Sequence, residues 1–169
     1  MSELSAARVK AQARKAKLLR WGLSLYPPYL GAGVRVKHIS ADFRQATVSM
    51  GLNRLNRNYV GTHFGGSLYS MVDPFFMLLL LESLGSDYFV WDKAAHIDFV
   101  SPGKGRVHAH FAISDALLAE IAERTAGGDK YLPELCVDVL NDDGELVARV
   151  HKTLYVRRKP KARTAQESA

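Results

Sequence analysis

A glycine-rich turn and one acidic residue in an apolar segment form the part of this chain that could do chemistry. Gly61, Gly65 and Gly66 lead directly into the apolar run 67–84, whose first half carries one acid, Asp73. Burying a carboxylate costs free energy unless the group has a partner or a use. The first N–H groups of a helix are free to bind an anion. These residues predict an acyl-group site, with backbone donors at Gly65 and Gly66 and with Asp73 as base or nucleophile.

Two neighbouring polar residues could join this site or serve the loop. Asn58 could hydrogen-bond an attacking water or a carbonyl oxygen, or it could make an Asx turn ahead of the helix. His63 could orient Asp73 or bind the carbonyl oxygen, although a lone loop histidine is more often structural. Asp73 could itself pair with a buried lysine or arginine instead of acting on a substrate. The turn also contains the substrate-binding candidates Gly61, Thr62, Phe64 and Ser67.

Composition and length predict a single domain in a reducing compartment. The 169 residues suffice for a sizeable core. Cys136 is the only cysteine, which excludes an internal disulfide and favours the cytoplasm. His96, Asp98, His108 and His110 alternate along two strand-like segments, a pattern more typical of a strand face than of a metal site. We therefore expect no metal and no redox cofactor.

The positive charge is concentrated at the two ends of the chain. Residues 1–20 hold six Lys/Arg and one Glu, and residues 157–169 hold five Lys/Arg and one Glu. The ends together carry a net charge of +9, which leaves the part between them at −3 from a total of +6. Because the central part is not basic, we expect no nucleic-acid partner. Membrane contact through the basic ends is an alternative that nothing else in the sequence supports.

Periodicity and turn signals predict an α+β domain. The predicted helices span residues 3–25, 66–84 and 116–125, and the predicted strands span 34–39, 42–50, 89–100, 106–113, 131–140 and 145–157. Within 89–100 we expect Trp91, Ala95, Ile97 and Phe99 on one face. One antiparallel sheet should wrap around the long central helix, with a helical extension at residues 1–30, the domain proper at 31–158 and a flexible basic tail at 159–169. Because the central helix is apolar nearly all round, we expect self-association into a dimer or a tetramer.

The motif Asn58-x-x-Gly61-x-x-x-Gly65-Gly66 followed by Asp73 resembles that of acyl-CoA thioesterases with the hotdog fold. In the phenylacetate-pathway type, a catalytic Asp follows the glycine pair by seven residues, as Asp73 follows Gly66. The stretch 61–69 with Asp73-Pro74 is similar to the DUF4442 group of bacterial hotdog proteins, and the resemblance covers roughly residues 15–158. One position departs from the pattern, because Phe64 stands where the related thioesterases have a histidine. Backbone donors survive that change, whereas an imidazole role at that position does not.

The resemblance implies a fold, a reaction and a set of partners. It implies a hotdog domain that hydrolyses acyl-CoA or another acyl thioester, with coenzyme A as part of the substrate and no other cofactor. The strand corresponding to 91–100 pairs with its twin in hotdog dimers, and Lys104 and Arg106 could meet the phosphates of coenzyme A. Two alternatives remain. One is a non-catalytic acyl-CoA binding or sensing protein, and the other is an enoyl-thioester hydratase or dehydratase, which a His63 facing the substrate would favour.

Overall fold

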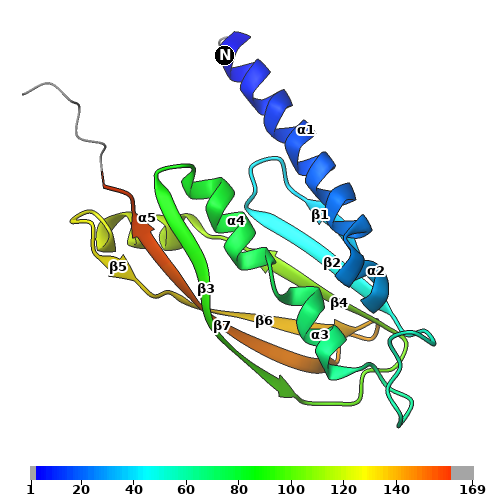
Figure 1. The fold of residues 1–169 in the computed structure, drawn as a ribbon. Helices are drawn as coiled ribbons and strands as arrows, with labels where there is room; N and C mark the ends of the chain where they lie inside the picture. Colours follow the sequence, from blue (N-terminus) through cyan, green and yellow to red (C-terminus); the bar gives the residue numbers. More distant parts are fainter. Residues whose placement is uncertain (1–2, 161–169) are drawn as a thin grey trace, which may run out of the picture.

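The computed structural model describes residues 3–160, which form one antiparallel sheet and five helices (Figure 1). The helices are α1 (Glu3–Leu25), α2 (Pro27–Ala32), α3 (Gly65–Val72), α4 (Phe75–Leu84) and α5 (Asp115–Arg124). The strands are β1 (Val34–Ile39), β2 (Gln45–Gly51), β3 (Tyr88–Phe99), β4 (Arg106–Ala112), β5 (Lys130–Tyr131), β6 (Glu134–Asn141) and β7 (Leu146–Arg158). Most of the predicted tail, residues 161–169, lies outside the described residues.

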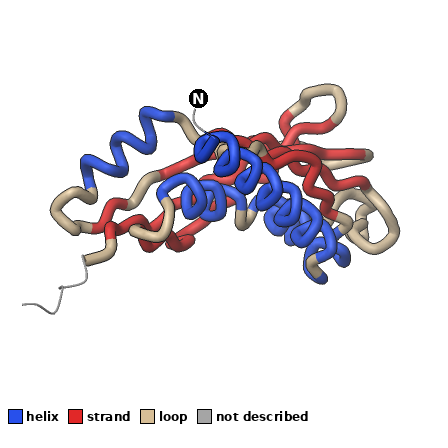
Figure 2. Tube along the Cα trace, turned by 90° about the horizontal axis from the view of Figure 1, so that it is seen from above, coloured by secondary structure: helices blue, strands red, loops and turns tan. Residues whose placement is uncertain are grey.

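The sheet has the strand order β1-β2-β4-β6-β7-β3, and the short β5 pairs with β7. Every pairing is antiparallel, and β1 and β3 form the two edges. Helices α1 to α4 lie along one side of the sheet (Figure 2). We call the side that faces α3 and α4 the inner face and the opposite side the outer face.

The core forms where α4 packs on the inner face. Alternating residues of β4 point toward it, so that Phe111 is buried and stacks on Phe75 with a centroid distance of 4.9 Å. Phe76 meets the same ring edge-on at 5.1 Å. The segment Gly65–Leu84 is long and apolar enough to cross a membrane by composition, but in this fold it is the helical layer of the core. The predicted α+β architecture is thus confirmed.

The central helix is not continuous, and the prediction of one helix over 66–84 was wrong in this respect. Helix α3 ends at Val72, and α4 begins at Phe75. Pro74 lies between them, and proline has no N–H to continue the hydrogen-bond ladder. The break leaves Asp73 at the C-terminal end of α3, between the two helices.

Two other predicted boundaries move for local reasons. The strand predicted from residue 42 begins at Gln45, because Ser40 Oγ accepts the N–H groups of Arg44 and Gln45 and holds a turn there. The prolines that follow α1 also begin a second helix. Proline is tolerated in the first turn of a helix, and α2 starts at Pro27.

A bulge in β3 changes which residues face the core. The pairing with β7 shifts between Asp92 and Ala94, so that Asp92 lies opposite Leu154 and Trp91 opposite Tyr155. Leu154 is fully buried, and cross-strand neighbours share a face. Asp92 therefore lies on the inner face and Trp91 on the outer face. The prediction that Trp91 shares a face with the other apolar residues of this strand was wrong, because an extra residue interrupts the alternation.

Candidate active site

The N-terminus of α3 presents two free backbone donors. Phe64 is the extended N-cap residue, and its N–H donates to the Asn56 carbonyl at 2.8 Å. Its own carbonyl accepts the N–H groups of Ser67 and Leu68. The N–H groups of Gly65 and Gly66 have no acceptor among the residues that the structure describes. They are therefore available to an oxyanion.

Aromatic rings lie close to both glycines. A Cβ atom on Gly65 would come within 2.8 Å of the Phe99 ring, and one on Gly66 would come within 2.5 Å of the Phe64 ring. A side chain at Gly65 would therefore displace Phe99, which belongs to the edge strand β3. Glycine at this position lets the edge strand approach the helix terminus.

A groove of about 660 Å³ opens beside the Gly65 donor. Leu68, Phe99 and Val100 supply apolar surface to it, and Lys104 also lines it. Apolar walls next to a free N–H suit a ligand with a hydrocarbon part and a carbonyl group. The structure thus brings the predicted Asn58, Thr62, His63, Gly65 and Lys104 to one groove.

The Asn58 side chain is occupied within its own loop. Its Oδ1 accepts the N–H groups of Val60 at 3.1 Å and Thr62 at 3.0 Å. Its Nδ2 donates to Thr62 Oγ1 at 2.9 Å and to the His63 carbonyl at 3.2 Å. Of the two roles predicted for Asn58, this geometry matches the Asx turn.

His63 joins two loops. Its side chain is buried, and the ring Nε2 lies 3.0 Å from the Gly105 carbonyl oxygen. Its backbone N–H donates to the Gly103 carbonyl. Nδ1 is also buried and has no partner among the described residues. Burial lowers the pKa of the imidazole, and the hydrogen bond with Gly105 opposes that shift in part. The ring therefore favours its neutral form and braces the turn against the loop before β4.

The Asp73 carboxylate has two partners in the structure. Its Oδ1 accepts hydrogen bonds from Tyr69 Oη at 2.7 Å and from Lys152 Nζ at 2.9 Å. Its side chain is 45% exposed, whereas that of Lys152 is only 1% exposed. The alternative of pairing with a buried lysine is thus present in the structure. Within residues 3–160 the hydrogen bonds of the carboxylate side chain all fall on Oδ1, which leaves Oδ2 available to solvent or a ligand.

Lys152 connects the helix layer to the sheet. Its Nζ lies 2.9 Å from Asp73 Oδ1 and 2.9 Å from Asp92 Oδ1. Burial disfavours the ammonium form, but the hydrogen bonds and charges of the two aspartates outweigh burial and raise its pKa. Lys152 is therefore an ammonium at neutral pH. It holds Asp73 in one position.

Lys152, Asp92 and Tyr69 are the site residues that sequence reasoning missed. A signal existed for Lys152, since it interrupts the apolar series Ala148, Val150, Leu154 on alternating positions of a strand. A lysine at such a position needs a partner. No comparable signal existed for Asp92, because the bulge reverses the face that simple alternation assigns to it.

The two parts of the predicted site lie at opposite ends of α3. Eight residues separate Gly65 from Asp73, which corresponds to about 12 Å along a helix axis. Asp73 is not among the residues that line the groove. One substrate carbonyl group therefore cannot contact both the Gly65 N–H and the Asp73 carboxylate of a single chain. Arg106 does not line the groove; it lies opposite Gly51 in the β2–β4 ladder and is exposed.

The sequence profile of the DUF4442 family, described as a domain of unknown function, matches residues 15–156. The chain belongs to the DUF4442 family. No curated protein matches it significantly. Many solved structures share its fold.

A Pseudomonas aeruginosa protein of unknown function, described as a probable thioesterase, has a TM-score of 0.75 at 18% identity, over 84% of this chain and 95% of that one. A thioesterase from Haemophilus influenzae has a TM-score of 0.62 at 12% identity, over 88% and 94%. A mutant of the phenylacetic acid degradation protein PaaI from Thermus thermophilus has a TM-score of 0.54 at 22% identity, over 76% and 97%. At these identities the comparisons show that the DUF4442 chain has the hotdog fold.

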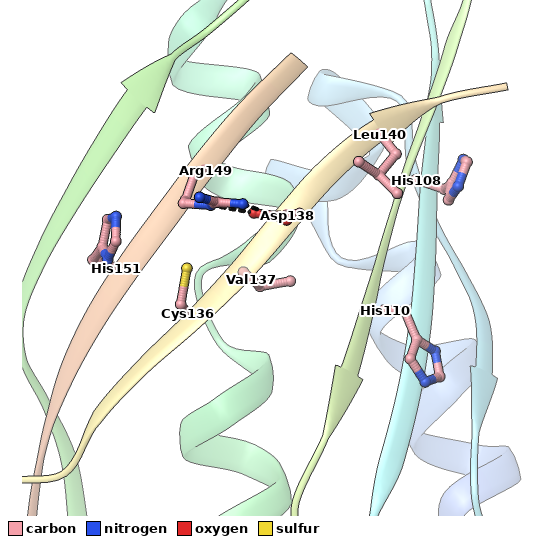
Figure 3. Close-up of a pocket in the computed structure, with 8 residues that line it drawn as sticks. All are labelled: His108, His110, Cys136, Val137, Asp138, Leu140, Arg149 and His151. Atoms are coloured by element: carbon pink, nitrogen blue, oxygen red, sulfur yellow. Dashed lines mark hydrogen bonds and ion pairs between the residues drawn. The ribbon is translucent and has the colours of Figure 1, made fainter. Parts of the chain in front are cut away.

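The outer face of this DUF4442 domain carries polar and charged side chains around a second pocket (Figure 3). A shallow pocket there is lined by His108, His110, Cys136, Val137, Asp138, Leu140, Arg149 and His151. Arg149 and Asp138 form an ion pair at 2.7 Å. Within residues 3–160 no three His, Cys, Asp or Glu side chains are grouped to hold a metal ion. The outer face does not adjoin the free donors of α3.

Proposed function

We propose that this protein hydrolyses acyl thioesters, with acyl-CoA as the substrate class. The observation that carries this proposal is the pair of free N–H groups at Gly65 and Gly66 beside an apolar groove. A carbonyl oxygen that gains negative charge during attack needs such donors, and they are most effective when they are fixed in advance. The fold shared with a thioesterase from Haemophilus influenzae supports the same reaction class. The groove would hold the acyl chain, and Lys104 would meet a carrier phosphate.

In this proposal, water is the nucleophile. Its oxygen attacks the thioester carbon, Asp73 Oδ2 takes the proton, and the Gly65 and Gly66 N–H groups hold the oxyanion. When the tetrahedral intermediate collapses, the C–S bond breaks and the proton passes to the leaving thiolate. A carboxylic acid and a free thiol result. Lys152 and Tyr69 keep Oδ1 occupied, so that Oδ2 faces the water.

We propose further that the site is completed by a second copy of the chain. The donors and Asp73 of one chain lie about 12 Å apart along α3, too far to act on one carbonyl. A two-fold axis that sets two α3 helices antiparallel brings Gly65 of one copy toward Asp73 of the partner subunit. The solvent-accessible half of the Asp73 side chain fits this arrangement.

The edge strand β3 is the surface that we propose for this homodimer. It has 12 residues, and within residues 3–160 it pairs on one side only, with β7. Trp91, Phe99 and Val100 are all more than half exposed at or beside this edge. A long open edge with apolar side chains is a template for strand pairing. A tetramer and a cytoplasmic location remain proposals of the same kind.

One observation favours a second candidate, a protein that binds acyl-CoA without hydrolysing it. The Asp73 carboxylate already forms an ion pair with Lys152 and accepts a hydrogen bond from Tyr69, so it has a structural role that needs no catalysis. The hydratase alternative receives less support, because the His63 ring is buried and bonded to Gly105.

Hydrolysis of short, long and aromatic acyl-CoAs, followed by release of free thiol, tests the proposal. Turnover should fall at least about 100-fold in Asp73→Asn, with unchanged circular dichroism. The matched control is Asp138→Asn on the outer face, which should keep full activity. Full activity of Asp73→Asn would remove this residue from the mechanism. Tight binding of acyl-CoA by a wild type that turns over no substrate would establish the binding protein instead.

A further inference from the structure

Helix α1 has two apolar faces, and only one of them is packed. Ala16 is buried at the contact with the domain, and Leu19 and Leu23 pack against the core beside it. On the opposite side of the helix, Leu18, Trp21 and Leu25 have exposed fractions of 62%, 55% and 63%. Positions 18, 21 and 25 share one face of a helix with 3.6 residues per turn. Three large apolar side chains thus form a row without a partner among the residues that the structure describes.

The apolar row continues past the end of α1 and points away from the sheet. Tyr26, just before α2, and Leu30, within α2, are also more than half exposed. A groove of about 460 Å³ runs beside the row, between Leu18 and Tyr26 on one side and the packed Leu19 and Leu23 on the other. The N-terminal half of α1 extends beyond the sheet (Figure 1). Apolar patches of this kind mark contacts with proteins or membranes.

Cationic side chains border this row on both sides. With 3.6 residues per turn, Lys10 and Lys17 fall on one side of it and Arg8 on the other, while Arg14 lies one turn before Leu18. Lys15 lies on the same side as Arg8 but is paired with Glu82 of α4 at 2.6 Å. Arg20 covers the Trp21 ring with its guanidinium 5.2 Å from the ring centroid. Residues 4–25 contain six Lys/Arg and no Asp or Glu. The partner of this face must therefore be apolar at its centre and anionic around it.

We propose that this face of α1 docks onto an anionic lipid surface. Leucine and tryptophan insert at the boundary between headgroups and acyl chains, and flanking lysines and arginines reach the lipid phosphates. A second copy of the chain fits less well. A two-fold contact through this face would set two helices of like charge against each other. The inference does not depend on the proposed hydrolase activity.

Co-sedimentation with vesicles tests the inference. The purified full chain should bind vesicles of phosphatidylglycerol mixed equally with phosphatidylcholine, and it should not bind vesicles of phosphatidylcholine alone. Added salt should weaken the binding by screening the cations. Leu18→Glu combined with Leu25→Glu should weaken binding at least about tenfold, and each cation removed in Lys10→Gln and Lys17→Gln should cost about fivefold. Lys93→Gln, on the bulge of β3, is the matched control and should bind as wild type does.

Tryptophan fluorescence reports which face inserts. The chain has two tryptophans, so Trp91→Phe leaves Trp21 as the only emitter. Its emission should shift to shorter wavelength on anionic vesicles. Absence of vesicle binding, binding without the Trp21 shift, or full binding by the Leu18/Leu25 double variant would each overturn the inference. A loss of oligomer in that double variant, seen by light scattering without lipid, would assign the face to a second copy. Hydrolysis of a short soluble acyl-CoA by the same variants separates this result from failure of the proposed function.

Discussion

Two ion pairs on strand β7 have nearly the same length and opposite surroundings. On the inner face, Lys152 contacts Asp73 at 2.9 Å and is 1% exposed. On the outer face, Arg149 contacts Asp138 at 2.7 Å, and the two side chains are 45% and 38% exposed (Figure 3). Successive side chains of a strand alternate between its faces, so residues three apart point to opposite sides.

The comparison teaches that burial and topology, more than contact distance, give an ion pair its role. The Arg149–Asp138 pair joins neighbouring strands in water, where screening and side-chain entropy leave it little net effect. The Lys152 cluster joins α3, β3 and β7, and it holds the carboxylate that we propose as the base. Removing the ammonium would leave the two aspartates without their shared cation.

Substitution of the two cations tests this difference directly. Lys152→Met should lower the free energy of unfolding by about 3 kcal/mol, because it leaves two partly buried carboxylates unpaired. Arg149→Met, the matched control, should leave the urea midpoint almost unchanged. Urea unfolding followed by circular dichroism measures both. Equal midpoints in the two variants would contradict the assigned role of burial. Turnover should also fall in Lys152→Met, since Asp73 loses a donor to Oδ1.

A second test compares Gly65, at the start of α3, with Gly51, at the end of β2. Gly65→Ala brings a Cβ atom within 2.8 Å of the Phe99 ring, and the resulting displacement of the donors should lower kcat/KM for an acyl-CoA about 100-fold. Gly51→Ala is the control, because a Cβ atom there meets nothing within 4 Å. Steady-state kinetics of both variants measure the effect. Wild-type kcat/KM in Gly65→Ala would place the oxyanion elsewhere.

The pH dependence of stability gives a third test, because His63 is buried whereas His110 is exposed on the outer face. His63 is buried and its pKa is lowered in the folded chain, mainly by desolvation. As pH falls below 6.5, the ordinary value, the unfolded chain takes up a proton that the folded chain resists. Stability should therefore be fully present above pH 6.5 and fall below it, by at most about 1.4 kcal/mol per pH unit.

Unfolding of His63→Gln and of His110→Gln at pH 7.5 and pH 5.5 separates this buried histidine from an exposed one. The pH dependence should shrink in His63→Gln. It should persist in His110→Gln, whose ring lies exposed on the outer face. An unchanged pH dependence in His63→Gln would show that other groups cause it.

The smallest expected effect comes from a buried hydroxyl. Tyr29 Oη is buried without a hydrogen-bond partner among the described residues, and desolvation raises its pKa, with the Asp73 charge adding to the shift. Tyr29→Phe should raise the free energy of unfolding by up to about 1 kcal/mol, since the unpaired polar atom is removed. Tyr155→Phe, on the outer face, should be neutral. Thermal unfolding compares the two, and a clear loss in Tyr29→Phe would indicate a partner for this hydroxyl in the native assembly.

Most of the fold could be predicted from local patterns. Alternation located β4, the Asn141–Gly144 turn located the β6–β7 hairpin, and the apolar run after Gly66 located the helical layer. These signals depend only on neighbours in the chain, so they survive in the sequence. The helix over 66–84 was predicted without a break, although Pro74, which has no N–H to donate, was the signal for one.

The partners of Asp73 could not be predicted in the same way. Lys152 lies 79 residues away in the sequence, and Asp92 reaches the same ammonium only because one extra residue in β3 reverses its face. Such contacts follow from strand order and register, which no local pattern encodes.

The sequence by itself determined the secondary structure, the glycine turn with its free donors, and the apolar helices over one sheet, because these follow from local backbone preferences and hydrophobic periodicity. Only the tertiary structure decided that Asp73 is paired with Lys152, that Asp92 reaches the same ammonium, and that Asn58 and His63 serve the loop. The physical reason is that burial and long-range charge pairing depend on which distant residues the sheet register brings together.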